Sequence, residues 1–236
     1  MSGRNFYLLT ALPALGDPGA EPPLSLTGFL QHLLDAPKPR REAEALFLGD
    51  DLRQREAVLA GEIAQPEPAV LTLEQARGDE PLPATLSAPE DPDRAGAALP
   101  TDAVWVAYYR CVAALARRSA FLAAWVPNEV GLRNALASAR AKALGLDAER
   151  YLVAPELAAP EEDFTAALGE WSAAGDPLAA LRALDAARWA WLVEHDRWFS
   201  FADDELDAYA AKLMLLHRWK RIVEAERAAA APPGRS

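Results

Sequence analysis

His195 is the residue whose neighbours most suggest catalysis, because it lies between Glu194 and Asp196. A histidine beside a carboxylate is the usual pair for general acid–base chemistry. Adjacent residues of a helix point in different directions, however, and a histidine among aromatic residues is typical of a packing or hydrogen-bonding role. We therefore predict no catalytic residue. The alternative is a small helical enzyme in which His195, Arg133 and Arg140 line a pocket for an anionic substrate.

A basic cluster lies between Tyr108 and Tyr151, where seven basic residues meet three acidic ones in a chain whose net charge is −11. A local excess of positive charge is either a solvated helix face or a docking surface for an acidic partner. We take the second interpretation and expect an interface that also includes two aromatic residues. The predicted interface residues are Arg117, Arg118, Asn128, Arg133, Asn134, Arg140, Trp191 and His195.

Two asparagines bracket one predicted helix of this cluster. Asn128 is placed to cap its N-terminus. Asn134 falls in the helix interior, where asparagine is a poor helix former, so we expect its side chain to bond across a helix contact. Trp189 and Trp191 are two residues apart on a later helix and cannot face the same core, so one of them is expected at a second contact.

The sequence has no phosphate-binding Gly-x-x-x-x-Gly-Lys-Ser/Thr loop, no Gly-x-Gly-x-x-Gly motif and no Gly-x-Ser-x-Gly elbow. It has one cysteine, Cys111, and three widely spaced histidines. These counts argue against a thiolate or histidine metal site and against a disulfide framework. We predict neither a metal nor a cofactor.

The elements that must position these residues read as helices. Apolar spacing, capping residues and Gly/Pro breaks predict a mainly α, irregular multi-helix bundle with at most a short strand at residues 6–10. The expected regions are an N-terminal helical region (1–64), a Pro-rich linker (65–100), a C-terminal helical region (101–230) and a disordered tail (231–236). The expected helices are 26–34, 41–63 (whole, or as 42–48 and 50–63), 71–77, 101–125, 128–144, 147–153, 161–173, 177–195 and 203–227.

Composition excludes several classes of protein. Half of the 236 residues are hydrophobic and a quarter are charged, so the chain can bury a core. An excess of 35 acidic over 24 basic residues argues against nucleic-acid binding and against attraction to anionic lipid. No apolar run reaches the length of a membrane span. We expect a soluble cytoplasmic protein without direct membrane insertion.

Three segments together resemble a bacterial family of proteins of unknown function that are encoded alongside V/A-type ATPase genes. The first resembles that family's aromatic-rich start and later proline pair, the second its central helix, and the third its W-x-W-L-E-E-H ending. They are residues 5–13 with Pro22 to Ser25 and Phe29-Leu30; Phe121 to Trp125 with Asn128, Leu132 to Leu136 and Ala139-Arg140; and Trp189 to His195 with Phe199 to Phe201, Leu206, Tyr209, Leu213 and Arg218-Trp219.

The segment from Asn128 to Arg140 is also similar to the helical motif of the C/d adaptor of V-type ATPases. That all-helical funnel sits on the membrane rotor ring and receives the foot of the central stalk. The resemblance implies a non-catalytic adaptor whose partners are the central-stalk and membrane-ring subunits, peripheral to the inner membrane through the ATPase. A free-standing assembly or regulatory factor of the same ATPase is the further alternative.

Overall fold

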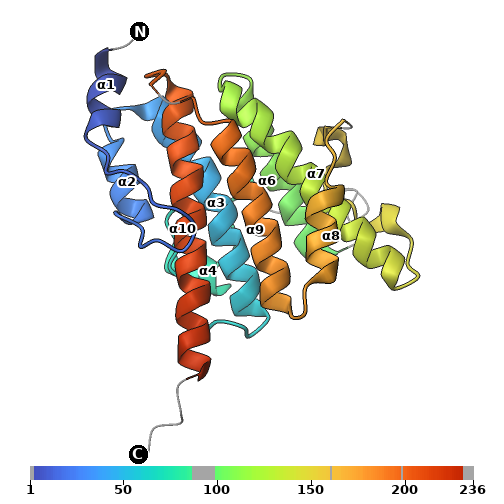
Figure 1. Ribbon diagram of the computed structural model, residues 1–236. Helices are drawn as coiled ribbons and strands as arrows, with labels where there is room; N and C mark the ends of the chain where they lie inside the picture. Colours follow the sequence, from blue (N-terminus) through green and yellow to red (C-terminus); the bar gives the residue numbers. More distant parts are fainter. Residues whose placement is uncertain (1–2, 87–98, 160, 198, 231–236) are drawn as a thin grey trace, which may run out of the picture. The chain divides into compact units, whose positions relative to one another are not determined.

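The computed structural model describes residues 3–86, 99–159, 161–197 and 199–230. Within these ranges it contains α-helices and two short 3-10 helices but no strand, which confirms the mainly α fold (Figure 1). The elements are α1 (Gly3–Thr10), α2 (Leu26–His32), α3 (Pro37–Leu59), α4 (Leu73–Arg77), α6 (Pro100–Ala116), α7 (Ala120–Ala143), η1 (Ala148–Tyr151), η2 (Pro155–Leu157), α8 (Thr165–Ala173), α9 (Pro177–Glu194) and α10 (Asp203–Ala230).

The chain forms two compact units, which we call the terminal unit (residues 1–50 and 189–236) and the central unit (residues 51–188). The division falls within α3, after Asp50, and within α9, after Arg188. The expected regions had their boundary in the Pro-rich segment 65–100 instead. Residues 87–98 of that segment and the predicted disordered tail 231–236 lie outside the described residues.

The core of the terminal unit is built from α2, the first part of α3, and α10. Phe29 and Phe47 are fully buried, with ring centroids 6.0 Å apart, and the Tyr209 ring stacks on Phe29 at 5.4 Å. Helix α10 contributes a buried face that begins at Leu206 and includes Leu213. The spacing of these residues places them on one side of the helix, and burial of that side joins α10 to α2.

The core of the central unit centres on the aromatic residues of α6, which packs along α7 (Figure 1). Trp105, Tyr108 and Tyr109 are each 1% exposed, and their ring centroids lie 5.1 to 5.8 Å apart. From α7, Leu122 and Val130 are fully buried. Large aromatic side chains at three nearby positions of one helix therefore fix the site at which α7 packs.

The predicted strand at residues 6–10 is wrong, because these residues belong to α1. The aromatic and aliphatic run has strand propensity, but the described chain offers no strand with which it could pair. A helix satisfies its own backbone groups without a partner. Asn5, on the buried side of α1, donates a hydrogen bond from Nδ2 to Asp203 Oδ1 over 2.8 Å and fastens the helix to α10.

The predicted helix break near Pro127 is also wrong. Helix α6 ends at Ala116, and α7 begins after Ser119, whose Oγ accepts the Leu122 N–H over 3.0 Å. Pro127 lies inside α7, although proline in a helix interior costs about 3 kcal/mol. Buried residues on both sides of it, among them Trp125 and Val130, give enough packing to keep the helix continuous. Asn128 is therefore a buried helix residue and not a cap.

The segment 41–63 forms part of one continuous helix, so the option of two helices divided at Gly49 is wrong. Asp50 and Asp51, expected at a helix start, lie inside α3 and are 1% and 0% exposed. Asp50 pairs with Arg221 within the terminal unit. Asp51 accepts the backbone N–H groups of residues 69, 70 and 71 over 2.7 to 2.8 Å. Each carboxylate thus has long-range partners that the local sequence does not reveal.

Several local signals are confirmed. Ser25 caps α2, its Oγ accepting the Gly28 N–H over 3.0 Å. Asp176 caps α9 by accepting two backbone N–H groups. Gly145, with φ of +68°, follows the C-cap of α7, as a glycine in the left-handed region should. The predicted segment 147–153 contains the 3-10 helix η1 rather than an α-helix.

Candidate functional site

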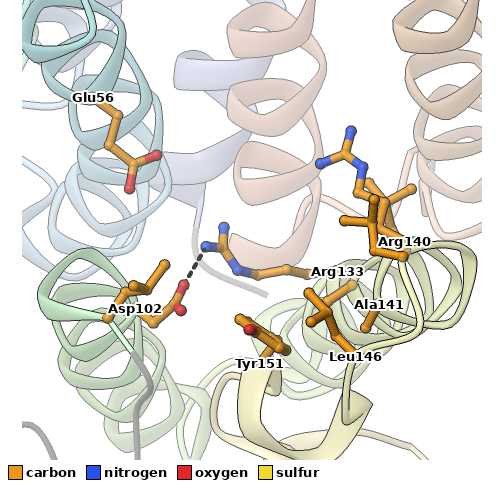
Figure 2. A pocket seen from close by; sticks show the side chains of 11 residues that line it. Glu56, Asp102, Arg133, Arg140, Ala141, Leu146 and Tyr151 are labelled. Carbon is orange, nitrogen blue, oxygen red and sulfur yellow. Dashed lines mark hydrogen bonds and ion pairs between the residues drawn. The ribbon is translucent and has the colours of Figure 1, made fainter.

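A hollow of about 420 Å³ opens on the central unit beside α7. Its wall combines two arginines, two carboxylates and a tyrosine with an apolar floor. Figure 2 shows the Arg133 guanidinium directed toward Asp102, with the Glu56 carboxylate and the Tyr151 ring on either side. We call it the α7 hollow; its lining residues are Glu56, Leu99, Asp102, Arg133, Leu136, Ala137, Arg140, Ala141, Leu144, Leu146 and Tyr151.

Arg133 is held in place by two contacts with α6. Its Nη2 lies 3.4 Å from Asp102 Oδ1, and its guanidinium lies over the Trp105 ring, 4.6 Å from the ring centre. Burial raises the pKa of the Asp102 carboxyl, although the positive charge of Arg133 works to lower it. An arginine stacked on an indole and paired with a half-buried carboxylate is a rigid part of the wall.

Trp105 connects this wall to a buried charge network. Its indole N–H donates to Glu56 Oε1 over 2.6 Å, and Arg53 lies 5.5 Å from the ring centre. Behind it, Glu129 of α7 is 3% exposed and pairs with Arg188 over 2.8 Å. Burial works to lower the pKa of the Arg188 guanidinium, but the nearby carboxylates outweigh it and raise that pKa.

This network was missing from the sequence-based prediction. The available signal was Glu129 itself, which follows Trp125 and Val126 at helical spacing and so falls on the buried side of α7. A carboxylate on that side needs a cationic partner. Its partners Arg53 and Arg188 lie 76 and 59 residues away along the chain, so only the fold identifies them.

Asn134 positions the outer wall of the α7 hollow. Its Nδ2 donates to the Val153 carbonyl over 2.9 Å, and its Oδ1 accepts the Val153 N–H over 2.8 Å. The pair is buried, and it ties the segment after Gly145 back onto α7. Leu146 and Tyr151, which line the hollow, belong to that segment. The expectation that Asn134 bonds across a contact is confirmed, and its role is to hold the wall.

The rim of the hollow exposes apolar side chains. Leu99, Leu144 and Leu146 are 49%, 73% and 47% exposed, and all three line the hollow. Arg140 is exposed beside them, with its guanidinium 5.5 Å from the centre of the Trp171 ring. Exposed leucines grouped around an arginine-bearing hollow are typical of a protein-binding surface.

The predicted interface residues do not form one site. Arg133 and Arg140 line the α7 hollow and Asn134 supports it. Asn128 is buried, and Arg117 and Arg118 are exposed on the connection between α6 and α7, apart from the hollow's lining. Trp191 and His195 belong to the terminal unit.

The position of His195 has a structural explanation. Its ring stacks on the Trp191 indole with 3.8 Å between centres, and its Nδ1 lies 2.9 Å from the Trp191 carbonyl oxygen. The α7 hollow is lined by Arg133 and Arg140 but not by His195. The arrangement required by the enzyme alternative, with all three around one pocket, is therefore not the arrangement of this hollow.

Metal-binding clusters and membrane-spanning helices are both absent from the described residues. These residues contain no group of three or more His, Cys, Asp or Glu side chains placed to hold a metal ion. In the same part of the chain, every helix is too short or too polar to cross a membrane.

The fold and the hollow define an all-α, multi-helix protein with an open surface hollow flanked by arginines and leucines. Comparison with family models, with curated proteins and with solved structures gives no match to this chain.

Proposed function

We propose that this chain is a non-catalytic helical adaptor of a V/A-type ATPase, linking the central stalk to the membrane ring. The resemblance of its three segments to proteins encoded with that ATPase supports the proposal. So does the helical architecture, which the similarity to the C/d adaptor leads one to expect. The observation that carries it is the rim of the α7 hollow, where three exposed leucines surround anchored arginines.

Coupling a rotating stalk to a ring requires a stiff contact. Helix α7 is continuous from Ala120 to Ala143, and its hollow is braced by Arg133 on Trp105 and by Asn134 on Val153. Side chains already held in one conformation lose little entropy on binding. The α7 hollow thus has the rigidity that a torque-bearing interface needs.

The charge of this surface suits an acidic partner. Of the basic residues between Tyr108 and Tyr151, all but Arg133 are exposed: Arg110, Arg117, Arg118, Arg140, Lys142 and Arg150. Potentials of opposite sign steer association and fix orientation. We therefore expect the partner to present carboxylates around one or more apolar side chains that enter the hollow.

The α7 hollow also favours the second candidate, a small helical enzyme for an anionic substrate. Its volume of about 420 Å³ lies within the range of small-molecule sites, and Arg133, Arg140 and Tyr151 converge on it. A thermal-shift screen of small carboxylates and phosphates separates the two candidates. Saturable stabilisation that Arg140→Ala abolishes favours the enzyme.

The direct test is purification of the tagged full chain from its own cells, followed by mass spectrometry of the co-purifying proteins. We expect stalk and ring subunits of the ATPase in fixed ratio. A ratio that is far below one chain per complex supports the assembly-factor alternative. If no part of the ATPase is recovered, the proposal is contradicted.

A variant pair assigns the contact to the α7 hollow. Leu144→Ser removes the most exposed leucine of the rim, whereas Leu59→Ser removes a leucine on α3 that is 57% exposed and does not line the hollow. We expect Leu144→Ser to weaken binding to the purified ATPase subunits about tenfold, the loss of roughly 1.4 kcal/mol. Leu59→Ser should bind like the wild type. Equal binding by both variants places the contact elsewhere.

A further inference from the structure

The terminal unit carries an exposed row of aromatic rings that the proposed function does not use. Tyr7 meets Phe6 with 5.7 Å between ring centres, Phe6 meets Phe201 at 5.2 Å, and Phe201 meets Phe199 at 6.4 Å. Tyr7, Phe199 and Phe6 are 75%, 74% and 47% exposed. We call these four residues the aromatic row. Large exposed aromatic side chains in contact with one another are typical of protein interfaces.

The row is built at a backbone cost. Phe199 has φ of +60° and Phe201 has φ of +51°, a region that bulky residues rarely adopt and that costs on the order of 1–3 kcal/mol for each residue. Glu205, in the first turn of α10, holds the turn in this shape. Its carboxylate accepts the Phe199 N–H over 3.1 Å and the Phe201 N–H over 2.9 Å, and it also accepts the Ser200 hydroxyl.

The strained turn places an aromatic ring in solvent rather than in the core. Because Glu205 fixes both backbone amides, the exposed Phe199 ring is presented in a defined position. A core-facing turn would leave this ring buried and would gain its transfer free energy. Strain that is maintained to expose an apolar group indicates a binding role.

The aromatic row continues into a second hollow, of about 440 Å³, which lies entirely within the terminal unit. Phe199 and Phe201 belong to both the row and the lining, and Trp189 contributes its indole. The expectation that one of Trp189 and Trp191 leaves the core thus has a structural counterpart, since Trp189 lines this hollow. The other lining residues are Leu9, Thr10, Leu12, Pro13, Ala14, Leu15, Gly16, Asp17, Val193, Asp196, Glu205, Tyr209 and Lys212.

The polar groups of this second hollow have partners inside the protein. The Tyr209 hydroxyl donates to the Pro13 carbonyl over 2.8 Å. Lys212 pairs with Asp196, and Glu205 accepts the three groups of the turn. An occupant that needs polar contacts would have to break these interactions. The hollow therefore favours apolar side chains.

The charges around the row favour a basic partner. The lining of the second hollow contains three carboxylates, Asp17, Asp196 and Glu205, and one ammonium group, Lys212. The segment 194–207, which carries the turn, contains six acidic residues and one arginine. A partner with lysine or arginine beside its apolar residues is complementary to this surface, whereas an anionic lipid surface is repelled by it.

We propose that the aromatic row and the second hollow bind a basic amphipathic α-helix of another protein. Such a helix presents apolar residues at i, i+3, i+4 and i+7 to the row and the hollow, and its flanking cations face the acidic segment. Within the proposed adaptor this is a second contact, whose charge preference is opposite to that of the α7 hollow. The binding test does not require the ATPase, so the two proposals can fail separately.

The probes are labelled synthetic peptides of about 18 residues, or five helical turns, titrated with the full chain and followed by fluorescence anisotropy. One peptide has leucine on one face and lysine on the other. The first control has the same composition with leucines spread around the helix, and the second keeps the leucine face but replaces lysine by glutamate. We expect saturable binding of the first peptide, at least about tenfold tighter than that of either control.

Phe199→Gly is the decisive variant. Glycine accepts a positive φ without strain, so this variant removes the ring while its melting temperature stays equal to or above that of the wild type. We expect it to bind the leucine–lysine peptide about tenfold more weakly. Leu34→Ser is the matched control, since Leu34 is 61% exposed in the same unit but does not line the hollow. It should bind like the wild type, and so should Leu144→Ser.

Four outcomes overturn the proposal. Equal affinity of Phe199→Gly and the wild type for the leucine–lysine peptide refutes the row as the contact. Equal affinity for the scrambled peptide refutes the helical face, and equal affinity for the glutamate peptide refutes the basic partner. Phe199-dependent binding to phosphatidylcholine or phosphatidylglycerol vesicles, without binding of the leucine–lysine peptide, assigns the row to a lipid surface instead.

Discussion

Removing the Asn134 side chain should unfasten the outer wall of the α7 hollow. In Asn134→Ala, the Val153 N–H and carbonyl lose partners at 2.8 and 2.9 Å in a buried position. A buried group left without a partner costs about 1–3 kcal/mol. Two such groups place the loss between about 2 and 6 kcal/mol, and partial hydration by a loosened segment favours the lower half. We expect about 3 kcal/mol.

Asn134→Asp tests the same pair by chemistry rather than by deletion. The introduced carboxylate can still accept the Val153 N–H but cannot donate to the Val153 carbonyl unless it is protonated. With an ordinary aspartate pKa near 3.9, protonation at pH 7 costs about 4 kcal/mol, and that cost falls by about 1.4 kcal/mol for each pH unit. The fold should raise the pKa of this carboxyl, so the stability deficit should shrink by up to about 3 kcal/mol between pH 7 and pH 5.

The assay is urea denaturation followed by tryptophan fluorescence, with hydrogen exchange at the Val153 amide as a local probe. Asn134→Ala should lower the free energy of unfolding and remove protection at Val153. A loss of less than about 0.5 kcal/mol with Val153 still protected would refute the reasoning, because it would mean that this pair does not fasten the wall. An Asn134→Asp deficit that stays constant with pH would show that the donor to the Val153 carbonyl is not needed.

Two further predictions concern stability. Burial raises the pKa of Glu42 to about 7, against the pull of Lys38. The folded chain therefore keeps a proton that the unfolded chain releases, so stability falls as the pH rises through 7, and Glu42→Gln should gain about 1–2 kcal/mol at pH 8 but little at pH 5; an equal effect at both values contradicts this. Ser119→Ala removes the cap of α7 and should cost about 1 kcal/mol in the same urea assay, whereas Ser138→Ala, inside α7, should cost clearly less.

Local chemistry predicted the ends of several helices. Ser25 and Asp176 cap helices because their own side chains meet the nearest free amides, and Gly145 takes the left-handed conformation after α7. Such signals act over two to four residues and can be read from the chain. Pro127 misled the prediction because its local preference is outweighed by the buried residues around it.

The candidate site was predictable only in part. Arg133 and Arg140 emerged from the excess of positive charge, and the bond of Asn134 followed from its unfavourable place in a helix. The Asn134 partner, Val153, is 19 residues away, and the partner of Glu129 is 59 residues away. No periodicity encodes such pairs. The exposed rim leucine Leu144 also read as an ordinary helix residue until the hollow was visible.

The interleaving of the two units along the chain sets the order in which they can form during synthesis. All of residues 51–188 leave the ribosome before Trp189, so the central unit has its full complement of residues while the terminal unit has only its first fifty. Until α10 emerges, the faces of Phe29 and Phe47 lack the helix that covers them. Nascent chains halted before residue 203 should therefore expose apolar surface from their N-terminal fifty residues and attract chaperones, whereas nascent chains that include α10 should not.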